Sequence, residues 1–204
     1  TALQARLESL LKVLPASSEL HQYSFSSRRS ENQDVNAVAL PGGNIVVFAG
    51  LLEEVKSENE LAMILGHELG HFAHRDHLRG LGRGLGLSLV SALLFGKDSA
   101  INNLISRTFL TFQASYSQQQ EEAADAFGLQ LLAARYGHVG GADDFFVRAA
   151  ASAGSRFEYL FDSHPHPNAR IEHLQNLITT NQYAIKETEP FVDDFSLPKG
   201  TTGD

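Results

Sequence analysis

Cysteine is absent from this sequence, so disulfide bonds and thiolate metal ligands are both excluded. Basic residues are few, 16 Lys and Arg against 24 Asp and Glu, which gives a net charge of -8. A nucleic-acid partner is not expected, because no basic field is present to neutralise phosphates. Long apolar runs are missing too, since 85–95 is far shorter than the roughly 20 residues that cross a bilayer as a helix. We interpret 85–95 as a buried helix, with peripheral membrane contact as the alternative.

The 204 residues, 43% of them hydrophobic, are enough for one well-buried domain and few for two. We expect a mostly helical α+β fold, with an N-terminal packing helix in 1–19, a catalytic domain over 20–180 and a polar tail over 181–204. The chain opens on Thr1 with no initiator Met and no signal-like segment, which indicates a mature or trimmed form.

The chain is organised around His67-Glu68-Leu69-Gly70-His71. Two histidines four residues apart project about 40° from each other on a helix, so both imidazoles can reach one metal ion. This is the H-E-x-x-H pattern of zinc hydrolases, in which the glutamate takes a proton from the water that the metal activates. The pattern is short enough to arise by chance, so a third ligand must be found.

Local signals predict the elements around this motif. Ser57 with Glu60 has the spacing of a capping box and predicts a helix that runs to about Leu78. Ser117 with Gln120 predicts a second helix through Arg135, followed by Gly137 as its C-cap. The other expected elements are a strand over 20–26, a loop over 27–34, a hairpin over 35–48 with its turn at 41–44, helices over 141–153 and 169–178, and an extended loop over 163–168.

His77 is one candidate for the third ligand, because it follows His71 by six residues, as in the metzincin pattern H-E-x-x-H-x-x-G-x-x-H. His74 occupies the glycine position of that pattern, where the chain must turn sharply. In a continuous helix, His77 would project about 240° from His71 and face away. The metzincin Met-turn is also missing, since Met63 precedes the motif. The metzincin interpretation is disfavoured, and His74 is expected to be exposed or to lie behind the ligands.

The other candidate is Glu121, in Glu121-Glu122-Ala123-Ala124-Asp125. Carboxylates at i and i+4 share one helix face, so Glu121 can ligate zinc while Asp125 accepts the remaining N–H of a ligand histidine. Taken alone, this segment would be interpreted as a solvated acidic helix start. Glu122 projects about 100° away from Glu121 and suits that role better.

Four blocks resemble the gluzincin family of HtpX and the CaaX prenyl proteases, to which BepA-like periplasmic proteases also belong. They are NAVALPGG at 36–43, HELGH at 67–71, EEAAD at 121–125, and SHP at 163–165 followed by RI at 170–171. The resemblance implies a zincin-type metalloprotease domain that holds one Zn2+ per chain. The residue roles it implies are zinc ligation by His67, His71 and Glu121, general-base catalysis by Glu68, orientation of a histidine by Asp125, and substrate binding on an edge strand at Asn36 and Ala37.

Two further residues take roles from the same resemblance. Some members place the histidine of the His-Pro element near the metal, and His164 is its equivalent here, either capping the zinc or facing the substrate. Arg170 could stabilise the oxyanion or pair with a carboxylate. HtpX and the prenyl proteases carry several membrane-spanning helices, so this chain resembles the soluble, peripheral branch, and CaaX processing is unsupported.

Together these residues predict zinc-dependent hydrolysis of peptide bonds in protein substrates, misfolded or envelope proteins, within the bacterial cell envelope. Glu68 would take the proton of the zinc-activated water and deliver it to the leaving amine. Peptide deformylases share the pattern but need a cysteine ligand, which this chain lacks. The alternative is a latent, self-inhibited protease that acts as a chaperone-like binding module, because a His164 cap would fill the position that water needs. The oligomeric state is not predicted.

Overall fold

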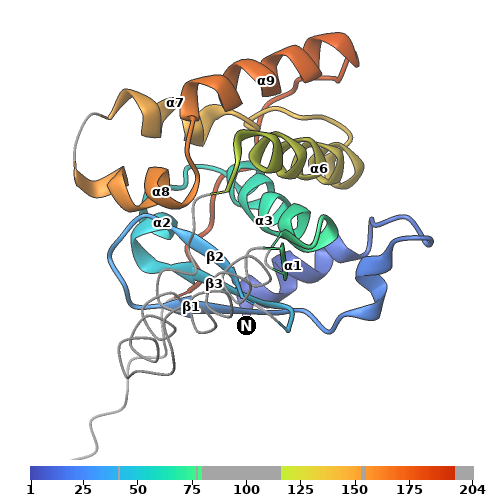
Figure 1. Cartoon of the computed structure of the whole chain (residues 1–204), viewed down its shortest axis with the longest axis horizontal. Coiled ribbons are helices and arrows are strands. Elements are labelled where there is room, and N and C mark those ends of the chain that lie inside the picture. Colours follow the sequence, from blue (N-terminus) through green and yellow to red (C-terminus); the bar gives the residue numbers. More distant parts are fainter. Residues whose placement is uncertain (41, 77, 80–115, 153–154, 196–204) are drawn as a thin grey trace, which may run out of the picture.

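The computed structural model describes residues 1–40, 42–76, 78–79, 116–152 and 155–195. Its elements are α1 (Ala2–Leu11), η1 (Glu19–Gln22), β1 (Ser26–Ser30), β2 (Ala37–Leu40), β3 (Asn44–Phe48), α2 (Ala49–Glu54), α3 (Glu58–Ala73), α6 (Gln118–Tyr136), α7 (Asp144–Ala151), η2 (Ser155–Phe157), α8 (Glu158–Ser163) and α9 (Pro167–Thr180). Helices α3 and α6 pack together at the centre, with the small sheet on one side and α7 and α9 on the other (Figure 1). The mostly helical α+β fold expected from the sequence is confirmed.

The three-stranded sheet has the order β1-β3-β2, with β1 parallel and β2 antiparallel to β3. The expected hairpin is therefore present, and its turn places Gly42 and Gly43 at positive φ (87° and 85°), which favours glycine. The prediction of a strand over 20–26 was wrong, because 19–22 form a 3-10 helix and the strand β1 lies at 26–30. Its Ser-Ser-Arg-Arg-Ser sequence carries no apolar alternation, and it is held by non-local pairing with β3.

One hydrophobic core joins α1, the sheet, α3 and α6. Its largest fully buried side chains include Leu3, Leu7 and Leu10 of α1, Ile45 of β3, Leu61, Met63, Leu65, Leu69 and Phe72 of α3, and Leu129 and Leu132 of α6. The leucines of α1 recur every three or four residues, so they form one helix face that packs on this core. Burial of that face against α3 and β1 holds the N-terminal helix on the rest of the molecule.

Helix α3 begins as the sequence predicts and ends early. The Ser57 Oγ accepts a hydrogen bond from the Glu60 N–H (3.1 Å), which caps the first turn. The helix stops at Ala73, short of the expected Leu78, because the chain turns at Arg75, whose φ is 55°. At the start of α6, both hydrogen bonds of the second predicted capping box are present. His77 and the run 85–95 lie outside the described residues.

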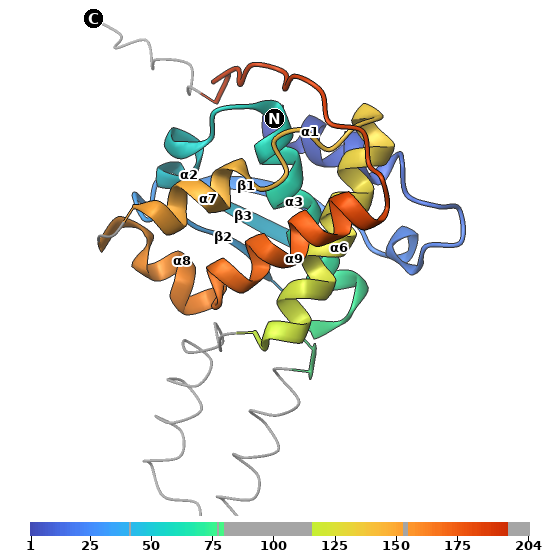
Figure 2. The same ribbon diagram turned by 90° about the horizontal axis from the view of Figure 1, so that it is seen from above.

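Beyond α9 the chain continues as an extended segment over the surface (Figure 2). The Val139 N–H donates to the Ala184 carbonyl (2.8 Å), and Pro190 forms a β-bridge with Ser57. Farther on, Asp194 forms an ion pair with Arg6 of α1. Residues 184–194 thus connect the end of α6 to the starts of α1 and α3. None of the helices described is long and apolar enough to cross a membrane.

Candidate metal centre

The close approach of α3 and α6 creates the site. A Cβ added to Gly66 would lie 2.9 Å from the Cα of Gly128, and one added to Gly70 would lie 2.7 Å from the Cα of Ala124. Real Cβ atoms do not approach other atoms this closely, so small residues are required where the two helices cross. The approach brings the histidine face of α3 against the acidic first turns of α6.

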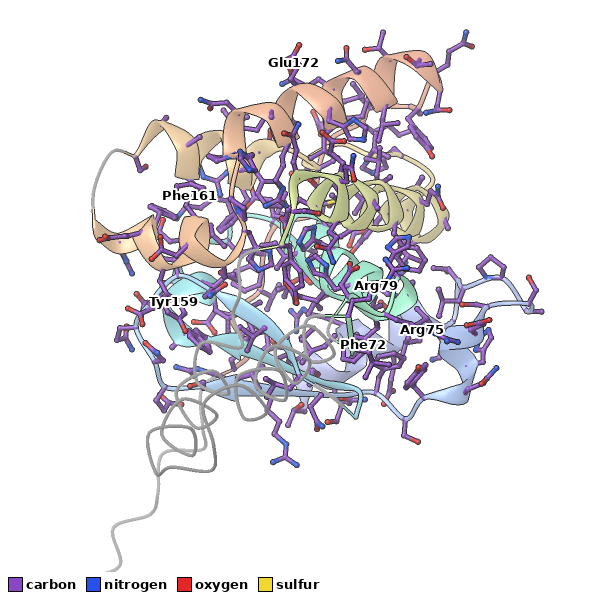
Figure 3. All side chains as sticks on the ribbon, viewed as in Figure 1. Phe72, Arg75, Arg79, Tyr159, Phe161 and Glu172 are labelled. Carbon is purple, nitrogen blue, oxygen red and sulfur yellow. The ribbon has the colours of Figure 1, made fainter. Side chains whose placement is uncertain are left out.

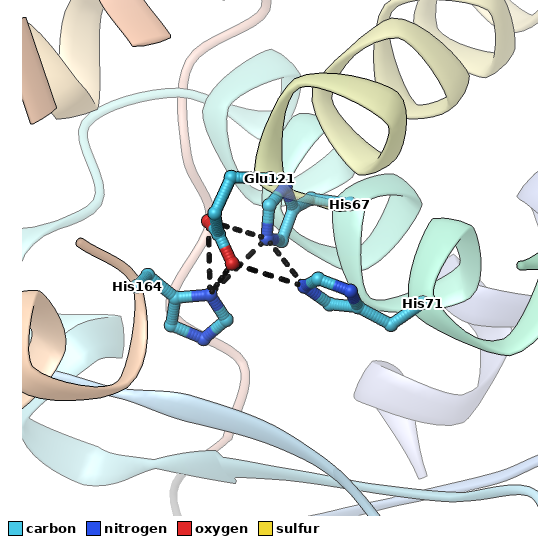
Figure 4. A group of neighbouring side chains, drawn as sticks. All are labelled: His67, His71, Glu121 and His164. Atoms are coloured by element: carbon cyan, nitrogen blue, oxygen red, sulfur yellow. Dashed lines mark hydrogen bonds and ion pairs between the residues drawn. The ribbon is translucent and has the colours of Figure 1, made fainter. Parts of the chain in front are cut away.

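Four side chains converge at this crossing, His67 and His71 from α3, Glu121 from α6, and His164 from the end of α8 (Figure 4). The Nε2 atoms of His67 and His71 lie 3.1 Å apart. The Glu121 carboxylate lies 3.6 Å from the first and 3.5 Å from the second. The Nδ1 of His164 lies 3.3 Å from the Nε2 of His67 and 3.2 Å from Glu121. All four residues are buried, and one candidate ligand atom from each lies within 4.8 Å of the others.

His67 is held by a buried ion-pair network. Its Nδ1 donates to Asp125 (2.8 Å), which also accepts from the Arg170 Nε (2.8 Å) and Nη2 (2.7 Å). Burial raises the pKa of Asp125, but Arg170 and His67 outweigh it and hold that pKa at about 2. Arg170 also reaches Glu121 through Nη1 (2.8 Å), so its contacts are those of carboxylate pairing, the second of the two roles expected for it.

Arg170 lies on the inner face of α9. Its guanidinium lies 4.7 Å from the ring centroid of Phe146 and its side chain is buried. Two residues later, Glu172 points outward from the same helix (Figure 3). The burial of an arginine is explained by its two carboxylate partners, since a buried charge is tolerated when it is paired.

His71 is held by residues that the sequence analysis did not identify. Its Nδ1 donates to Asp76 (3.0 Å), which lies just beyond the turn at the end of α3. Asp76 also accepts from the Gln120 side-chain amide (2.7 Å), and the Tyr116 ring stacks on His71 at 3.7 Å. Burial lowers the pKa of His71, but hydrogen bonds to Asp76 and Glu121 outweigh it and raise that pKa to about 9. His74, the C-cap of α3, is not among the four converging residues.

The donor set suits a divalent cation. Carboxylates only accept hydrogen bonds, so in the neutral rings Asp125 and Asp76 place the protons of His67 and His71 on Nδ1, and both Nε2 lone pairs then face each other. Four buried carboxylates, Glu68, Asp76, Glu121 and Asp125, belong to this region. In the described part of the chain, the buried arginine that offsets them is Arg170. Converging lone pairs with excess negative charge fit a bound cation, and imidazole nitrogens with a carboxylate oxygen are ligands that zinc accepts.

Glu68 faces a small cavity beside this cluster. Its Oε1 lies 3.6 Å from the Nε2 of His164, and its Oε2 has no hydrogen-bond partner in the described residues. The cavity measures about 10 Å³ and is lined by Asn36 and Ala37 among others. That volume is close to the minimum for one water molecule. The Asn36 Nδ2 donates to the Ser163 Oγ (3.2 Å), which ties the start of β2 to the residue before His164.

The structure therefore brings together all nine residues to which the sequence analysis assigned a site role. Seven form the connected polar cluster, and Asn36 and Ala37 line the cavity next to Glu68. Their catalytic and binding roles stay predictions. The residues that sequence reasoning missed are those behind His71, namely Asp76, Gln120 and Tyr116. Asp76 follows His71 by five residues, which is not a helical contact distance, so no spacing rule signalled it.

Comparison with known proteins agrees with this geometry. The model of peptidase family M48 matches residues 1–178. Metalloprotease YcaL of Escherichia coli is 32% identical over 161 residues, and mitochondrial metalloendopeptidase OMA1 of Arabidopsis thaliana is 35% identical over 124 residues. The beta-barrel assembly-enhancing protease of E. coli is 28% identical over 185 residues. The matches cover 73%, 60% and 84% of this chain, and 60%, 25% and 37% of those relatives respectively.

Proposed function

Since the chain belongs to peptidase family M48, we propose that it is a zinc-dependent endopeptidase that hydrolyses peptide bonds in protein substrates. The observation that carries the proposal is the convergence of the His67, His71 and Glu121 lone pairs beside Glu68, a buried carboxylate with an unpartnered oxygen among the described residues. We propose misfolded or envelope proteins as substrates and the bacterial envelope as the location. The name of one bacterial relative, a beta-barrel assembly-enhancing protease, supports the envelope.

In this proposal His67, His71 and Glu121 hold one zinc ion per chain. When bound, the ion supplies Lewis acidity, which polarises a carbonyl group and lowers the pKa of water toward about 7. Asp125 keeps the proton of His67 on Nδ1, so that its Nε2 stays available as a ligand. Arg170 fixes Asp125 and Glu121 relative to each other through its three short contacts.

Glu68 acts as the general base. Its free Oε2 accepts the proton of the attacking water, and the same carboxyl group then delivers it to the leaving amine. Asn36 and Ala37 bind the substrate. Ala37 begins β2 and Asn36 directly precedes it, and β2 is an edge strand of the described sheet because it pairs with β3 on one side alone. An extended peptide can add to such an edge through backbone hydrogen bonds. The Nε2 of His164 lies 3.6 Å from Glu68. When the His164 side chain moves out of the ligand cluster, its ring can donate a hydrogen bond to the developing oxyanion.

The test is Glu68→Gln, which keeps the size of the side chain and removes its ability to take a proton. Zinc content should stay at the wild-type level, while cleavage of casein should fall by about 10²- to 10⁴-fold, the usual contribution of a general base. Glu122→Gln, one residue from the ligand Glu121, is the matched control and should cleave normally. Retained cleavage in Glu68→Gln ends the general-base assignment.

A second candidate is a latent protease that binds unfolded proteins without cleaving them. The position of His164 favours it, since the Nδ1 of His164 lies within 3.3 Å of both His67 and Glu121 and the adjoining cavity has room for about one water. The discriminating result is an inert wild-type protein that suppresses aggregation of an unfolded substrate, together with chelator-sensitive cleavage by His164→Ala. His173→Ala, on α9, is the control and should behave as wild type. Cleavage by the wild-type protein rejects latency.

A further inference from the structure

We infer that Asp76 is a positioning residue of the metal site, which sets the tautomer and the ring orientation of His71. The inference rests on the proposed function, because it assumes that His71 is a zinc ligand, and it adds a residue to which neither the sequence pattern nor the family match assigns a role. Asp76 is buried, and its Oδ2 accepts the hydrogen bond of the His71 Nδ1 at 3.0 Å. With the proton fixed on Nδ1, the Nε2 lone pair of His71 faces His67 and Glu121.

The local fold delivers Asp76 to this position. In a continuous α3, a residue five positions after His71 would project about 140° from it and could not reach its ring. The helix ends at Ala73 instead, and Arg75 adopts φ 55°, a left-handed conformation that is uncommon for a residue with a side chain. Backbone in such a conformation persists where surrounding contacts hold it. The hydrogen bond between Asp76 and His71 is such a contact.

A second helix holds Asp76 from the other side. The Gln120 Nε2 donates to Asp76 at 2.7 Å, while its Oε1 accepts from the Ser117 backbone N–H at 3.1 Å. Gln120 therefore closes the capping box of α6 and supports Asp76 with the same side chain. Because Gln120 directly precedes Glu121, this contact also fixes the first turn of α6 against the end of α3. The Tyr116 ring is stacked on one face of the His71 imidazole and so limits the rotation of that imidazole.

The two carboxylates behind the histidines differ in charge balance. Asp125 is neutralised by a bidentate pair with the buried Arg170. Asp76 forms a hydrogen bond with His71, and in the described residues it also pairs with Arg79. The Nη1 of Arg79 lies 3.6 Å from the Asp76 carboxylate, and 67% of the arginine side chain is exposed. The negative charge of Asp76 is therefore less neutralised than that of Asp125. Its hydrogen bond with the Nδ1–H of His71 is stronger for that reason, and it makes the Nε2 of His71 a stronger metal ligand.

The experiment is the zinc affinity of Asp76→Asn, measured by competition with a chromophoric chelator. We expect binding about 10- to 100-fold weaker than wild type, because loss of such a hydrogen-bonded carboxylate has that effect in other metal sites. The absorption spectrum of the cobalt-substituted protein should shift, since the geometry at His71 changes. Asp76→Glu, which keeps the charge, should restore much of the affinity and the spectrum. Asp193→Asn, an exposed aspartate in the C-terminal segment, is the control.

The outcomes separate this inference from the proposed function. Wild-type affinity and an unchanged cobalt spectrum in Asp76→Asn overturn the inference and leave the proposed function standing. Equal losses in Asp76→Asn and Asp76→Glu also overturn it, because they indicate a packing role in place of a charged one. A wild-type protein that binds no zinc refutes the proposed function itself. If Asp76→Asn does not fold without metal, the rate of zinc release into excess EDTA is measured on the loaded protein, and faster release than wild type is expected.

Discussion

Two arginines in this molecule make similar contacts in different surroundings. Arg6, on α1, binds Glu58 through Nε and Nη2 (both 2.7 Å) and Asp194 through Nη1 (2.8 Å). Its guanidinium lies 4.9 Å from the ring centroid of Phe195. Arg170 repeats this pattern with one bidentate carboxylate, one monodentate carboxylate and one aromatic ring.

The two networks differ in exposure to water. The side chains of Arg6, Glu58 and Asp194 are 19%, 15% and 48% exposed, whereas Arg170 is 3% exposed and both of its carboxylate partners are fully buried. Partly exposed ion pairs are weakened by solvent and contribute little to stability. Buried charges cost several kcal/mol each to remove from water and depend on their partners. Similar ion-pair geometry therefore serves two purposes: the outer network attaches the C-terminal segment, and the inner one fixes residues at the candidate metal site.

The largest effect is expected from Arg170→Met, which leaves the carboxylates of Asp125 and Glu121 buried without their cation. We expect the free energy of unfolding to fall by about 3–5 kcal/mol, and zinc binding to be lost with it. Urea denaturation followed by circular dichroism measures the first, and chelator competition the second. Arg28→Met, at an exposed arginine on β1, is the control and should stay near wild type. A loss under about 1 kcal/mol in Arg170→Met would show that the two networks are energetically alike.

Gly70→Ala should have the next largest effect, because it tests whether close helix packing keeps the inner network together. The new Cβ would lie 2.7 Å from the Cα of Ala124, so α6 must shift and carry Glu121 with it. We expect a loss of about 1–3 kcal/mol in the free energy of unfolding, together with weaker zinc binding. Intrinsic helix propensity alone would favour alanine by about 1 kcal/mol. Stabilisation of the variant would therefore contradict the packing argument.

Arg6→Met should cost about 1 kcal/mol or less in the same urea experiment, because its network is partly exposed. Methionine keeps much of the apolar contact with Phe195. Zinc affinity should be unchanged, since Arg6 lies in the network that joins α1 to the C-terminal segment. A loss as large as that of Arg170→Met would remove the distinction between the inner and outer networks.

The smallest effect is a response to salt. At 1 M ionic strength the screening length is about 3 Å, so exposed pairs lose most of their attraction. The difference in urea midpoint between wild type and Arg6→Met should shrink in 1 M NaCl relative to 0.1 M. The difference for Arg170→Met should persist, because Arg170 and its two carboxylate partners are buried and salt screens buried pairs much less. Equal salt sensitivity of the two variants would contradict this expectation.

Much of the fold and the site could be predicted where the signal is local. The capping residues Ser57 and Ser117 and the turn glycines act on their own neighbours, and the helix starts and the hairpin lie where they indicate. The histidine pair followed in the same way from helical spacing. Convergence of Glu121 on that pair is a tertiary contact, and it was predicted by family resemblance more than by any rule of spacing.

The features that escaped prediction depend on contacts between distant segments. Gly66 and Gly70, four residues apart on α3, face Gly128 and Ala124, four residues apart on α6. Small residues on matching faces were visible in the sequence, but nothing local paired these two helices. The polar strand β1 exists because β3 lies beside it, and its own residues carry no strand signal. Asp76 reaches His71 through a left-handed Arg75, which residue preference argues against.

The excess of buried carboxylate at the α3–α6 crossing has a consequence for how long the protein persists. A cation that binds the folded chain and not the unfolded chain stabilises the fold by mass action. Four carboxylates near one arginine would repel each other more strongly without a cation than with one, and the crossing helices are the centre of the core. Partly unfolded molecules are degraded faster by cellular proteases. Metal supply would then govern the turnover of this protein as well as the activity proposed for it.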